Sequence, residues 1–391
     1  MAAPRFTKVT IGRLENDVPP AAMNTFHAVG DINGDGRPDI VVSGRNGRMV
    51  WFENTGDRGN WPVHPVEDVE AMECGGQIRD LTGDGLGDII NGNDFRGHQI
   101  FWWANPGPRG GAWQRRAIAT TDLSQFHDTT LGRLAGEDAD SLVFTNQVRG
   151  TNIYRVPLPA DPTQAPWPNL QVIATARGEP FVKADGTDRI QPEEGLAIGD
   201  VDGDGVNEIV CGTHWYKLVG GRWCGHKFAS GYITTKIAIA DIDGDGRNEI
   251  LLAEGDPCVY GKAQGGKLAW FKRGPDARAP WTEHVLLEGL HDAHSLQVGD
   301  LCGNGRPDIL CGEVGVANRA DDRYVRPPRL IVLENEGRGR FTPHVIDEGT
   351  GIHDAVLADM LGRGVLDIVG KPLHGDEKWH VHVYFNDTAR P

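Results

Sequence analysis

Three short segments place histidine next to aspartate ahead of an apolar run: "FHD" at 126–128, "HDAH" at 291–294 and "IHD" at 352–354. The imidazole group has an ordinary pKa near 6.5, so a histidine beside a carboxylate can give or take a proton at neutral pH. A strand with a purely structural role begins with turn residues and small polar caps. The repeated histidines therefore indicate general acid–base chemistry, provided that the fold brings them together.

One pattern recurs along the chain and shows how these segments are arranged. Six copies are evident, from "GDINGDGRPDIVVSG" at 30–44 to "ADMLGRGVLDIVGKP" at 358–372, and "GRLAGEDADSLVFTN" at 132–146 is a decayed seventh. Each copy contains a loop, and position 1 of the loop falls at residues 31, 80, 133, 200, 241, 300 and 359. Successive loops therefore start 41 to 67 residues apart. That spacing is the size of a four-stranded propeller blade with variable loops. The sequence predicts an all-β protein, a single seven-bladed β-propeller.

The two ends of the chain complement each other. After its loop, each copy continues into a β-branched strand, an aromatic strand such as "RMVWFEN" and an outer strand such as "RFTPHVIDEG". The last copy stops after its aromatic strand, "VHVYFND", whereas "RFTKVTIG" at 5–12 matches an outer strand. We expect residues 5–12 to complete the last blade and remove two exposed sheet edges. The predicted blades lie in one domain, 1–391, and cover 24–68, 73–121, 125–176, 193–231, 232–289, 290–349 and 351–387 with 5–12.

The loops carry oxygen ligands at fixed spacing. In "DINGDGRPD" at 31–39, side-chain oxygens at positions 1, 3, 5 and 9 and a carbonyl at position 7 suit calcium, and glycine at position 6 allows a sharp turn. The loop resembles an EF-hand loop with its last acid moved forward, as in FG-GAP/VCBS-type propeller repeats, which implies a propeller with structural calcium. The expected ligands are Asp31, Asn33, Asp35, Asp39, Asp80, Asp84, Asp88, Asp200, Asp202, Asp204, Glu208, Asp241, Asp243, Asp245 and Glu249.

Three loops depart from this pattern. Arg133 starts the third loop, which we expect to be empty, and Cys302 interrupts the sixth. Leu361 and Arg363 interrupt the seventh, where the guanidinium is expected to take the place of the cation.

The opposite ends of the inner strands carry the ionisable residues. Counting back six positions from each loop start gives Thr25, Cys74, His127, Glu194, Thr235, His294 and His353, and the next positions include Asp128, Lys236 and Asp354. Because inner strands run side by side around the axis of a propeller, these residues should ring one mouth of the central channel. The expected catalytic residues are His127, Glu194, Lys236, His294 and His353. The alternative is that histidine and aspartate merely cap the inner strands.

Polar loops between the second and third strands should surround the same mouth. The loop at 313–328 is long and is expected to cover the mouth as a lid. The candidate substrate-binding residues are His27, Arg96, His98, Asp128, Arg149, His214, Trp215, Tyr324, Arg326, Asp354 and His374.

The chemistry that fits these residues is an elimination. The sequence contains no nucleophile elbow, P-loop or dinucleotide fingerprint. A histidine could take a proton beside a carbonyl, a second histidine or Glu194 could protonate an oxygen leaving group, and Lys236, an arginine or a metal could hold the enolate. Zinc, manganese or iron could bind through His127, His294 and His353. We expect a carbon–oxygen lyase acting on a sugar, a dehydratase or eliminase.

A second resemblance favours the same chemistry. The segments "HSLQVGDLCGNGRPDIL" and "IHDAVLADM" are similar to blade entrances in the propeller of the fungal aldos-2-ulose dehydratase (1,5-anhydrofructose dehydratase) family, which implies dehydration of a keto-sugar. Propeller polysaccharide lyases with histidine-centred sites are a neighbouring resemblance. The alternative function is a non-catalytic propeller that binds carbohydrate or protein. A lectin would repeat its binding residues from blade to blade, whereas the residues at this mouth vary.

The net charge and the lack of a long apolar run limit the kinds of partner that the protein is expected to bind. The net charge of −16 disfavours nucleic acid and anionic membranes, and no run of 18 apolar residues is present to span a bilayer. We expect a small-molecule or oligosaccharide substrate, no nucleic acid and no membrane. The opening "MAAPRFTKVTIG" lacks the apolar core of a signal peptide, so we expect a cytoplasmic protein, or a secreted one if a leader has been removed.

Overall fold

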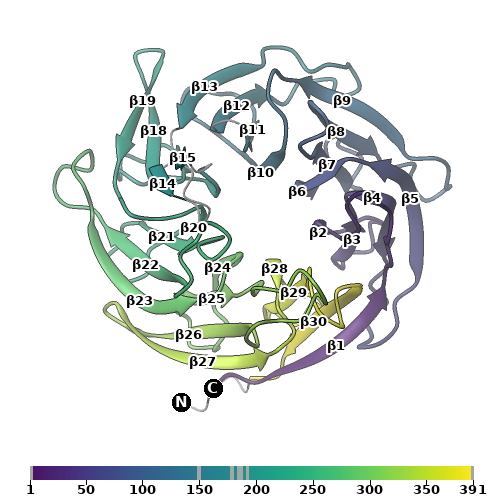
Figure 1. Ribbon diagram of the computed structural model, residues 1–391. Coiled ribbons are helices and arrows are strands. Elements are labelled where there is room, and N and C mark those ends of the chain that lie inside the picture. The colour runs from purple at the N-terminus through teal and green to yellow at the C-terminus, as the bar shows by residue number, and fades with distance from the viewer. Residues whose placement is uncertain (1–2, 148–150, 177–179, 183–187, 191–192, 389–391) are drawn as a thin grey trace.

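The computed structural model describes residues 3–147, 151–176, 180–182, 188–190 and 193–388. Seven four-stranded antiparallel sheets stand in a ring around a central axis (Figure 1). All regular elements of the described residues are strands, so this part of the chain contains no helix that could cross a bilayer. The all-β, seven-bladed propeller that the repeats predict is confirmed.

Blades 1 to 6 run from an inner strand to an outer strand in chain order, and blade 7 takes β1 as its outer strand. Blade 1 contains β2 (Phe26–Gly30), β3 (Asp39–Ser43), β4 (Asn46–Phe52) and β5 (Val63–Glu70); blade 2 contains β6 (Met72–Arg79), β7 (Asp88–Asn93), β8 (Gln99–Ala104) and β9 (Gln114–Thr120); blade 3 contains β10 (Phe126–Gly132), β11 (Ser141–Asn146), β12 (Thr151–Pro157) and β13 (Gln171–Ala176). Blade 4 contains β16 (Leu196–Gly199), β17 (Glu208–Cys211), β18 (His214–Val219) and β19 (Arg222–Lys227); blade 5 contains β20 (Thr235–Ala240), β21 (Glu249–Glu254), β22 (Gly266–Lys272) and β23 (Thr282–Leu290). Blade 6 contains β24 (Ser295–Gly299), β25 (Asp308–Gly312), β26 (Arg329–Gly337) and β27 (Arg340–Glu348); blade 7 contains β28 (His353–Ala358), β29 (Asp367–Lys371), β30 (His380–Asn386) and β1 (Phe6–Arg13). A hairpin of β14 (Pro180–Val182) and β15 (Asp188–Ile190), which the repeat pattern does not predict, lies between blades 3 and 4 in the chain.

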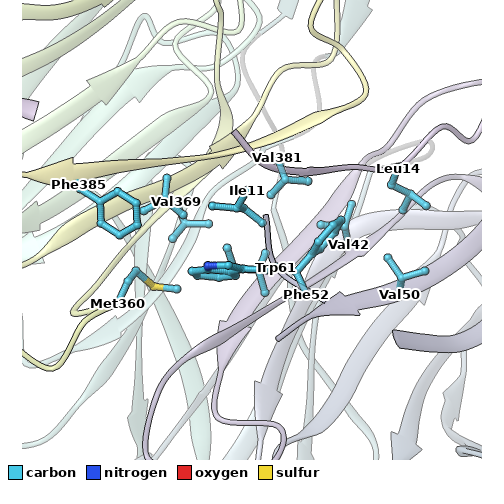
Figure 2. Close-up of a cluster of buried hydrophobic side chains, with 12 residues drawn as sticks. Ile11, Leu14, Val42, Val50, Phe52, Trp61, Met360, Val369, Val381 and Phe385 are labelled. Carbon is cyan, nitrogen blue, oxygen red and sulfur yellow. The ribbon is translucent and has the colours of Figure 1, made fainter. Parts of the chain in front are cut away.

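The first strand closes the ring, as the sequence predicts. β1 pairs antiparallel with β30, with Phe6 opposite Asn386 and Arg13 opposite His380. Figure 2 shows the hydrophobic cluster at this seam, where Ile11 of β1 packs with Phe52 of blade 1 and Val369 of blade 7. Burying one such side chain contributes about 1.5–3 kcal/mol, so the seam is held by packing as well as by strand pairing.

The loops that open each second strand are held by a repeated carboxylate contact. In the six loops with an acid at position 9, that carboxylate accepts the backbone N–H of position 2 at 2.9–3.2 Å. In blades 1, 2, 6 and 7 the acid is aspartate, and its other oxygen accepts the N–H of an asparagine just after or at the end of the third strand. These asparagines are Asn54, Asn105, Asn335 and Asn386. Each also donates its side-chain amide to the position-2 carbonyl of the adjacent blade at 2.6–2.8 Å, so it ties two blades together.

Blades 4 and 5 use different residues for the same purpose. Their acid at position 9 is glutamate, and an asparagine at position 8 makes the contact between blades. Asn207 donates to the Arg133 carbonyl at 2.9 Å, and Asn248 donates to the Asp200 carbonyl at 2.8 Å. The propeller therefore has two classes of loop, which differ in how they are tied and in how their charge is balanced.

Candidate active site

A β-bulge carries the histidine–aspartate pair in blades 3 and 7. The register of β10 shifts between Phe126 and Thr129, and that of β28 shifts between His353 and Val356. Asp354 has φ of 52°, a left-handed conformation that few residues with side chains adopt. Bulges redirect side chains next to functional sites. Here they turn the aspartates of both blades towards one lysine.

Lys236 of β20 lies between these two aspartates. Its Nζ is 2.7 Å from Asp354 Oδ1 and 3.9 Å from Asp128 Oδ1, and its side chain is 10 % exposed. Burial opposes the charge on the ammonium, but Asp354 and Asp128 hold the pKa of Lys236 well above its ordinary value. A fixed positive charge therefore lies at the channel, where it can stabilise negative charge that develops on a substrate.

The structure brings together the three histidines that the sequence places on separate blades. The rings of His127 and His294 have centroids 6.1 Å apart and meet edge to face. The rings of His294 and His353 are stacked, with centroids 4.9 Å apart and 16° between their planes. Inner strands of similar length around one axis produce this convergence.

His294 is oriented by an acid that the sequence analysis missed. Asp256, in the loop after β21, has Oδ1 2.8 Å from His294 Nε2, and the Nδ1 atom of His294 is buried without a hydrogen-bond partner. Burial opposes a charged ring, but Asp256 outweighs it and raises the pKa of His294. In His353, by contrast, burial lowers the pKa well below the ordinary value, even though Asp354 acts in the opposite direction. One stacked imidazole therefore favours the charged form and the other the neutral form.

Glu194, two residues before β16, lies beside the cluster of three histidines. It is 1 % exposed, and its Oε2 atom has no hydrogen-bond partner and lies 3.9 Å from His127 Nε2. Burial raises its pKa to about 7. Ligand atoms of Glu194, Asp256 and His294 all lie within 4.8 Å of one another. Imidazole with two carboxylates is a donor set that suits a divalent transition metal. His127 and His353, which the sequence predicts as ligands, are not in this group.

A small cavity adjoins the cluster. Asp128, Lys236, His294 and Asp354 line a space of about 160 Å³ together with the inner strands of blades 4 to 7. The side chains of His294 and His353 are only 5 % exposed, whereas that of Asp354 is 26 % exposed. A substrate in this space would meet Lys236, His294 and the two aspartates first. His353 lies directly behind His294.

Other blades use the same entrance positions for structural contacts. Thr25 donates its hydroxyl to the Met72 carbonyl, and Thr235 donates to the Glu194 carbonyl. The Cys74 thiol donates to the His127 carbonyl at 3.4 Å, and burial raises its pKa to about 12. These residues join neighbouring inner strands and leave the acid–base groups to the other blades.

A buried histidine–lysine pair lies near Asp354, with the histidine on blade 1 and the lysine on blade 7. His27 is 5 % exposed, and neither of its ring nitrogens has a hydrogen-bond partner. Burial, followed by the charge of Lys371, lowers the pKa of His27 to about 3. Lys371 is fully buried, donates to the Asn24 carbonyl and has its pKa lowered to about 8 by burial. The sequence analysis missed Lys371 because it ends a second strand instead of beginning a first strand.

The predicted contact between Trp215 and substrate is wrong. Trp215 is 1 % exposed, belongs to the hydrophobic core that blades 4 and 5 share, and packs on His226 across the blade at 4.4 Å. Side chains alternate between the faces of a strand, and this tryptophan lies on the buried face of β18. His214, its neighbour, is half-buried, with Nδ1 3.3 Å from an oxygen of Glu193.

Five other predicted substrate residues lie outside the histidine cluster. Arg96 pairs with Asp94 and lines a groove of about 850 Å³ at blades 1 and 2, and His98 is exposed. Tyr324 and His374 line a separate cavity of about 430 Å³, and Arg326 is paired with Glu313. Arg149 lies outside the described residues.

The expected lid packs on blade 7. In the loop 313–328, the Tyr324 hydroxyl donates to the carbonyls of Thr350 and His374, and Asp322 contacts His374 and Lys378. This loop is therefore anchored beside the loop that precedes β30. Of the predicted substrate residues, Asp128 and Asp354 are the ones that line the cavity with the catalytic candidates.

The loops of blades 1 and 2 have acids arranged to bind a calcium ion. In blade 2, Asp80 accepts the amides of Gly83 and Gly85, and burial raises the pKa of Asp88 to about 6. Within the described residues, no lysine or arginine forms an ion pair with Asp80, Asp84 or Asp88, so a calcium ion would not have to displace a basic side chain from this loop. The blade 1 loop is built in the same way, although Arg37 contacts Asp35. Calcium fits both loops and stays a prediction there.

The remaining loops contain basic side chains. In blade 7, the Arg363 guanidinium lies 2.8 Å from Asp367, as the sequence predicts. In blade 3, Arg133 points its Nε to Asp140. In blades 4 and 5, lysine ammonium groups contact the predicted calcium ligands, so a calcium ion would have to displace a lysine, although three acids of each loop lie close enough together to hold a metal ion.

Comparison with known proteins identifies the repeat. Residues 241–311 match the FG-GAP-like repeat family, and residues 28–56 match the FG-GAP repeat family. These two segments carry FG-GAP repeats within a seven-bladed β-propeller. A search of curated protein sequences found no significant match to this chain.

Solved structures share its fold at low sequence identity. Rhamnogalacturonan lyase YesW is 14 % identical with a TM-score of 0.50, and Bacillus licheniformis rhamnogalacturonan lyase PL11 is 13 % identical with a TM-score of 0.52. Each match covers 99 % of this chain and 76 % of the other chain. A chain from the crystal structure of BBS1N in complex with ARL6DN is 11 % identical, with a TM-score of 0.52 and 99 % coverage of both chains. These likenesses show a common fold.

Proposed function

We propose that this protein is a carbon–oxygen lyase that acts on a carbohydrate at the histidine-lined end of the central channel. The observation that carries the proposal is that residues of three blades converge: His294 and Lys236 line one cavity, and the ring of His353 stacks on that of His294. An elimination beside a carbonyl needs a base, an acid and a group that stabilises an enolate. These three side chains supply all of them.

The roles follow from the surroundings of each group. His353, which favours the neutral form, takes the proton from the carbon next to the carbonyl, and the resulting enolate forms beside the Lys236 ammonium. The carbon–oxygen bond on the adjacent carbon then breaks as the new C=C bond forms. The leaving oxygen takes a proton from His294, which Asp256 keeps in its charged form. Both rings are nearly covered, and Tyr260 of the loop 255–265 lies near Glu194 and Asp256, so substrate entry would displace this loop.

A metal would fit the same cluster. Glu194, Asp256 and His294 would hold a divalent transition ion, which when bound would polarise a carbonyl oxygen. His127, whose pKa is raised well above its ordinary value by Cys74 and Glu194 against the effect of burial, would then be the remaining charged imidazole. Structural calcium belongs to the loops of blades 1 and 2.

The fold comparisons give this proposal modest support. The similar structures include rhamnogalacturonan lyases, so propellers of this shape are found among lyases that act on carbohydrate. Identity of 13–14 % carries the fold and not the site.

Two substrates test the proposal directly. The protein would be incubated with 1,5-anhydrofructose and with rhamnogalacturonan, and formation of the conjugated C=C–C=O product would be followed by ultraviolet absorbance. We expect product from one of the two with the native protein, and none with the double variant His294→Gln, His353→Gln. Proton exchange at the carbon next to the carbonyl, measured by NMR in D₂O, detects the first step alone. Neither product nor exchange with either substrate would overturn the proposal.

A further inference from the structure

The loops of blades 4 and 5 differ from those of blades 1 and 2 in a way that recurs. In blade 4, Lys217 Nζ lies 2.5 Å from Asp202, 2.7 Å from Asp204 and 3.2 Å from Glu208. These carboxylates occupy positions 3, 5 and 9 of the loop, which are the positions expected to bind calcium. The ammonium therefore sits where the cation would sit.

Blade 5 repeats the arrangement. Lys272 Nζ contacts Asp243 and lies 2.8 Å from Asp245. Lys217 follows Tyr216, which pairs with Ile209, and Lys272 follows Phe271, which pairs with Ile250. The two lysines thus occupy one register position of the third strand. Because the same lysine–aspartate contact occurs in two blades, it is a property of this loop type and not an accident of one loop.

The other blades have no lysine at this register position. In blade 2 the equivalent residue is Ala104, after Trp103, and in blade 1 it is Glu53, which binds His64 at 2.7 Å. The acid at position 9 of the loop also differs between blades with this lysine and blades without it. Position 9 is aspartate in blades 1 and 2 and glutamate in blades 4 and 5. The extra methylene lets Glu208 accept the Val201 amide through Oε2 while its Oε1 reaches Lys217.

We propose that Lys217 and Lys272 act as tethered cations that replace calcium in blades 4 and 5, so that calcium binding is confined to blades 1 and 2. In both lysine-filled loops, carboxylate oxygens from positions 1, 3 and 9 lie within 4.8 Å of one another. Such a group of carboxylates is repulsive unless a positive charge lies among them. A lysine on the adjacent strand supplies that charge at all calcium concentrations. Blades 4 and 5 are then stable without calcium.

The test compares calcium stoichiometry and thermal stability in variants of the full chain. Lys217→Met and Lys272→Met keep the aliphatic stem and remove the charge. Lys267→Met is the matched control, because Lys267 lies on the same strand as Lys272 but pairs with Glu283. Each protein is stripped with a chelator and titrated with calcium alone. We expect each loop variant to gain one calcium site, with affinity raised by roughly tenfold or more, and to acquire a calcium-dependent Tm.

A second pair of variants tests the same loops if the lysine variants do not fold. Asp202→Asn and Asp243→Asn weaken these loops as calcium sites in the presence of the native lysines. We expect both to leave the calcium stoichiometry unchanged, whereas Asp84→Asn in blade 2 lowers it. Loss of a bound calcium in Asp202→Asn or Asp243→Asn would overturn the proposal. Failure of calcium to bind the two lysine variants would overturn it as well.

Discussion

The imidazole of His294 stacks on that of His353 with ring centroids 4.9 Å apart, and the two rings respond to their surroundings in opposite ways. Both are almost completely buried, which disfavours the charged form of each. Asp256 reverses this effect for His294, whereas burial dominates for His353. An acid and a base thus lie in contact at one end of the channel, and pairs of groups with divergent pKa values are a mark of acid–base catalysis.

Removing either ring should abolish turnover without unfolding the protein. His353→Gln removes the base and His294→Gln removes the acid, so each is expected to lower kcat by about 10²–10⁴-fold. His284→Gln is the control, because His284 stacks on Trp270 at 4.1 Å on the outer part of blade 5. Turnover is measured by ultraviolet absorbance and folding by circular dichroism. Unchanged kcat in a folded variant would remove that histidine from the mechanism.

Asp256 should act by orienting His294. Asp256→Asn keeps the size of the side chain but removes the charge that favours the imidazolium, so kcat is expected to fall by about 10²-fold while KM changes little. Asp256→Glu should recover part of the loss, since it restores a carboxylate. A purely structural role would instead lower Tm and leave kcat unchanged in the folded fraction. Steady-state kinetics together with thermal unfolding separate these outcomes.

His27 should make the protein sensitive to acid. Its folded pKa of about 3 lies below the unfolded value near 6.5, so between these values the unfolded chain binds more protons and the free energy of unfolding falls as pH falls. Above pH 6.5 this penalty is absent. His27→Met should reduce the slope by up to about 1.4 kcal/mol per pH unit in that range.

Urea unfolding of the native chain and His27→Met at pH 8 and pH 5 measures this slope. At pH 8 the variant should be at least as stable as the native chain, because both ring nitrogens of His27 lack partners, and an unsatisfied buried polar group costs about 1–3 kcal/mol. His98→Met is the control, since His98 is exposed. Equal slopes for the native chain and His27→Met would contradict the assignment of His27 as a buried neutral group.

Asn54 should hold blades 1 and 7 together. Its amide donates to the Met360 carbonyl at 2.6 Å, and its backbone N–H donates to Asp39. Asn54→Ala leaves the Met360 carbonyl without this partner and should lower the free energy of unfolding by about 1–3 kcal/mol. Thr55→Ala, at an exposed neighbour, should change it by less than about 0.5 kcal/mol. Chemical denaturation of both variants tests the tie, and equal stabilities would show that it contributes nothing.

Much of the fold can be predicted from the sequence because most blades repeat the same short residue pattern, and the decayed copy in blade 3 keeps its register. The loop acids, the glycine at position 6 and the alternation of strand residues act within one blade, so they can be recognised without knowing the neighbours. The same regularity explains why counting back along inner strands found His127, Glu194, Lys236, His294 and His353. Strands of similar length around one axis bring equal positions to the same level.

The residues that the sequence analysis missed or misplaced depend on contacts between elements. Asp256 comes from a loop and meets His294 of the next blade, and Lys371 ends a second strand beside His27 of another blade. Trp215 was placed at the mouth, but the face of β18 on which it lies is buried between blades 4 and 5. A short sequence pattern within one blade does not predict which residue of another blade a side chain will contact.

Sequence alone therefore determined the number of blades, the closure of the ring by residues 5–12 and the positions of the ionisable residues at the channel, because these follow from short repeated patterns. Tertiary structure alone decided which imidazole is charged, which loops contain a lysine among their acids and which aromatic residues are buried. Those properties depend on burial and on distances between blades, and the closed ring sets both.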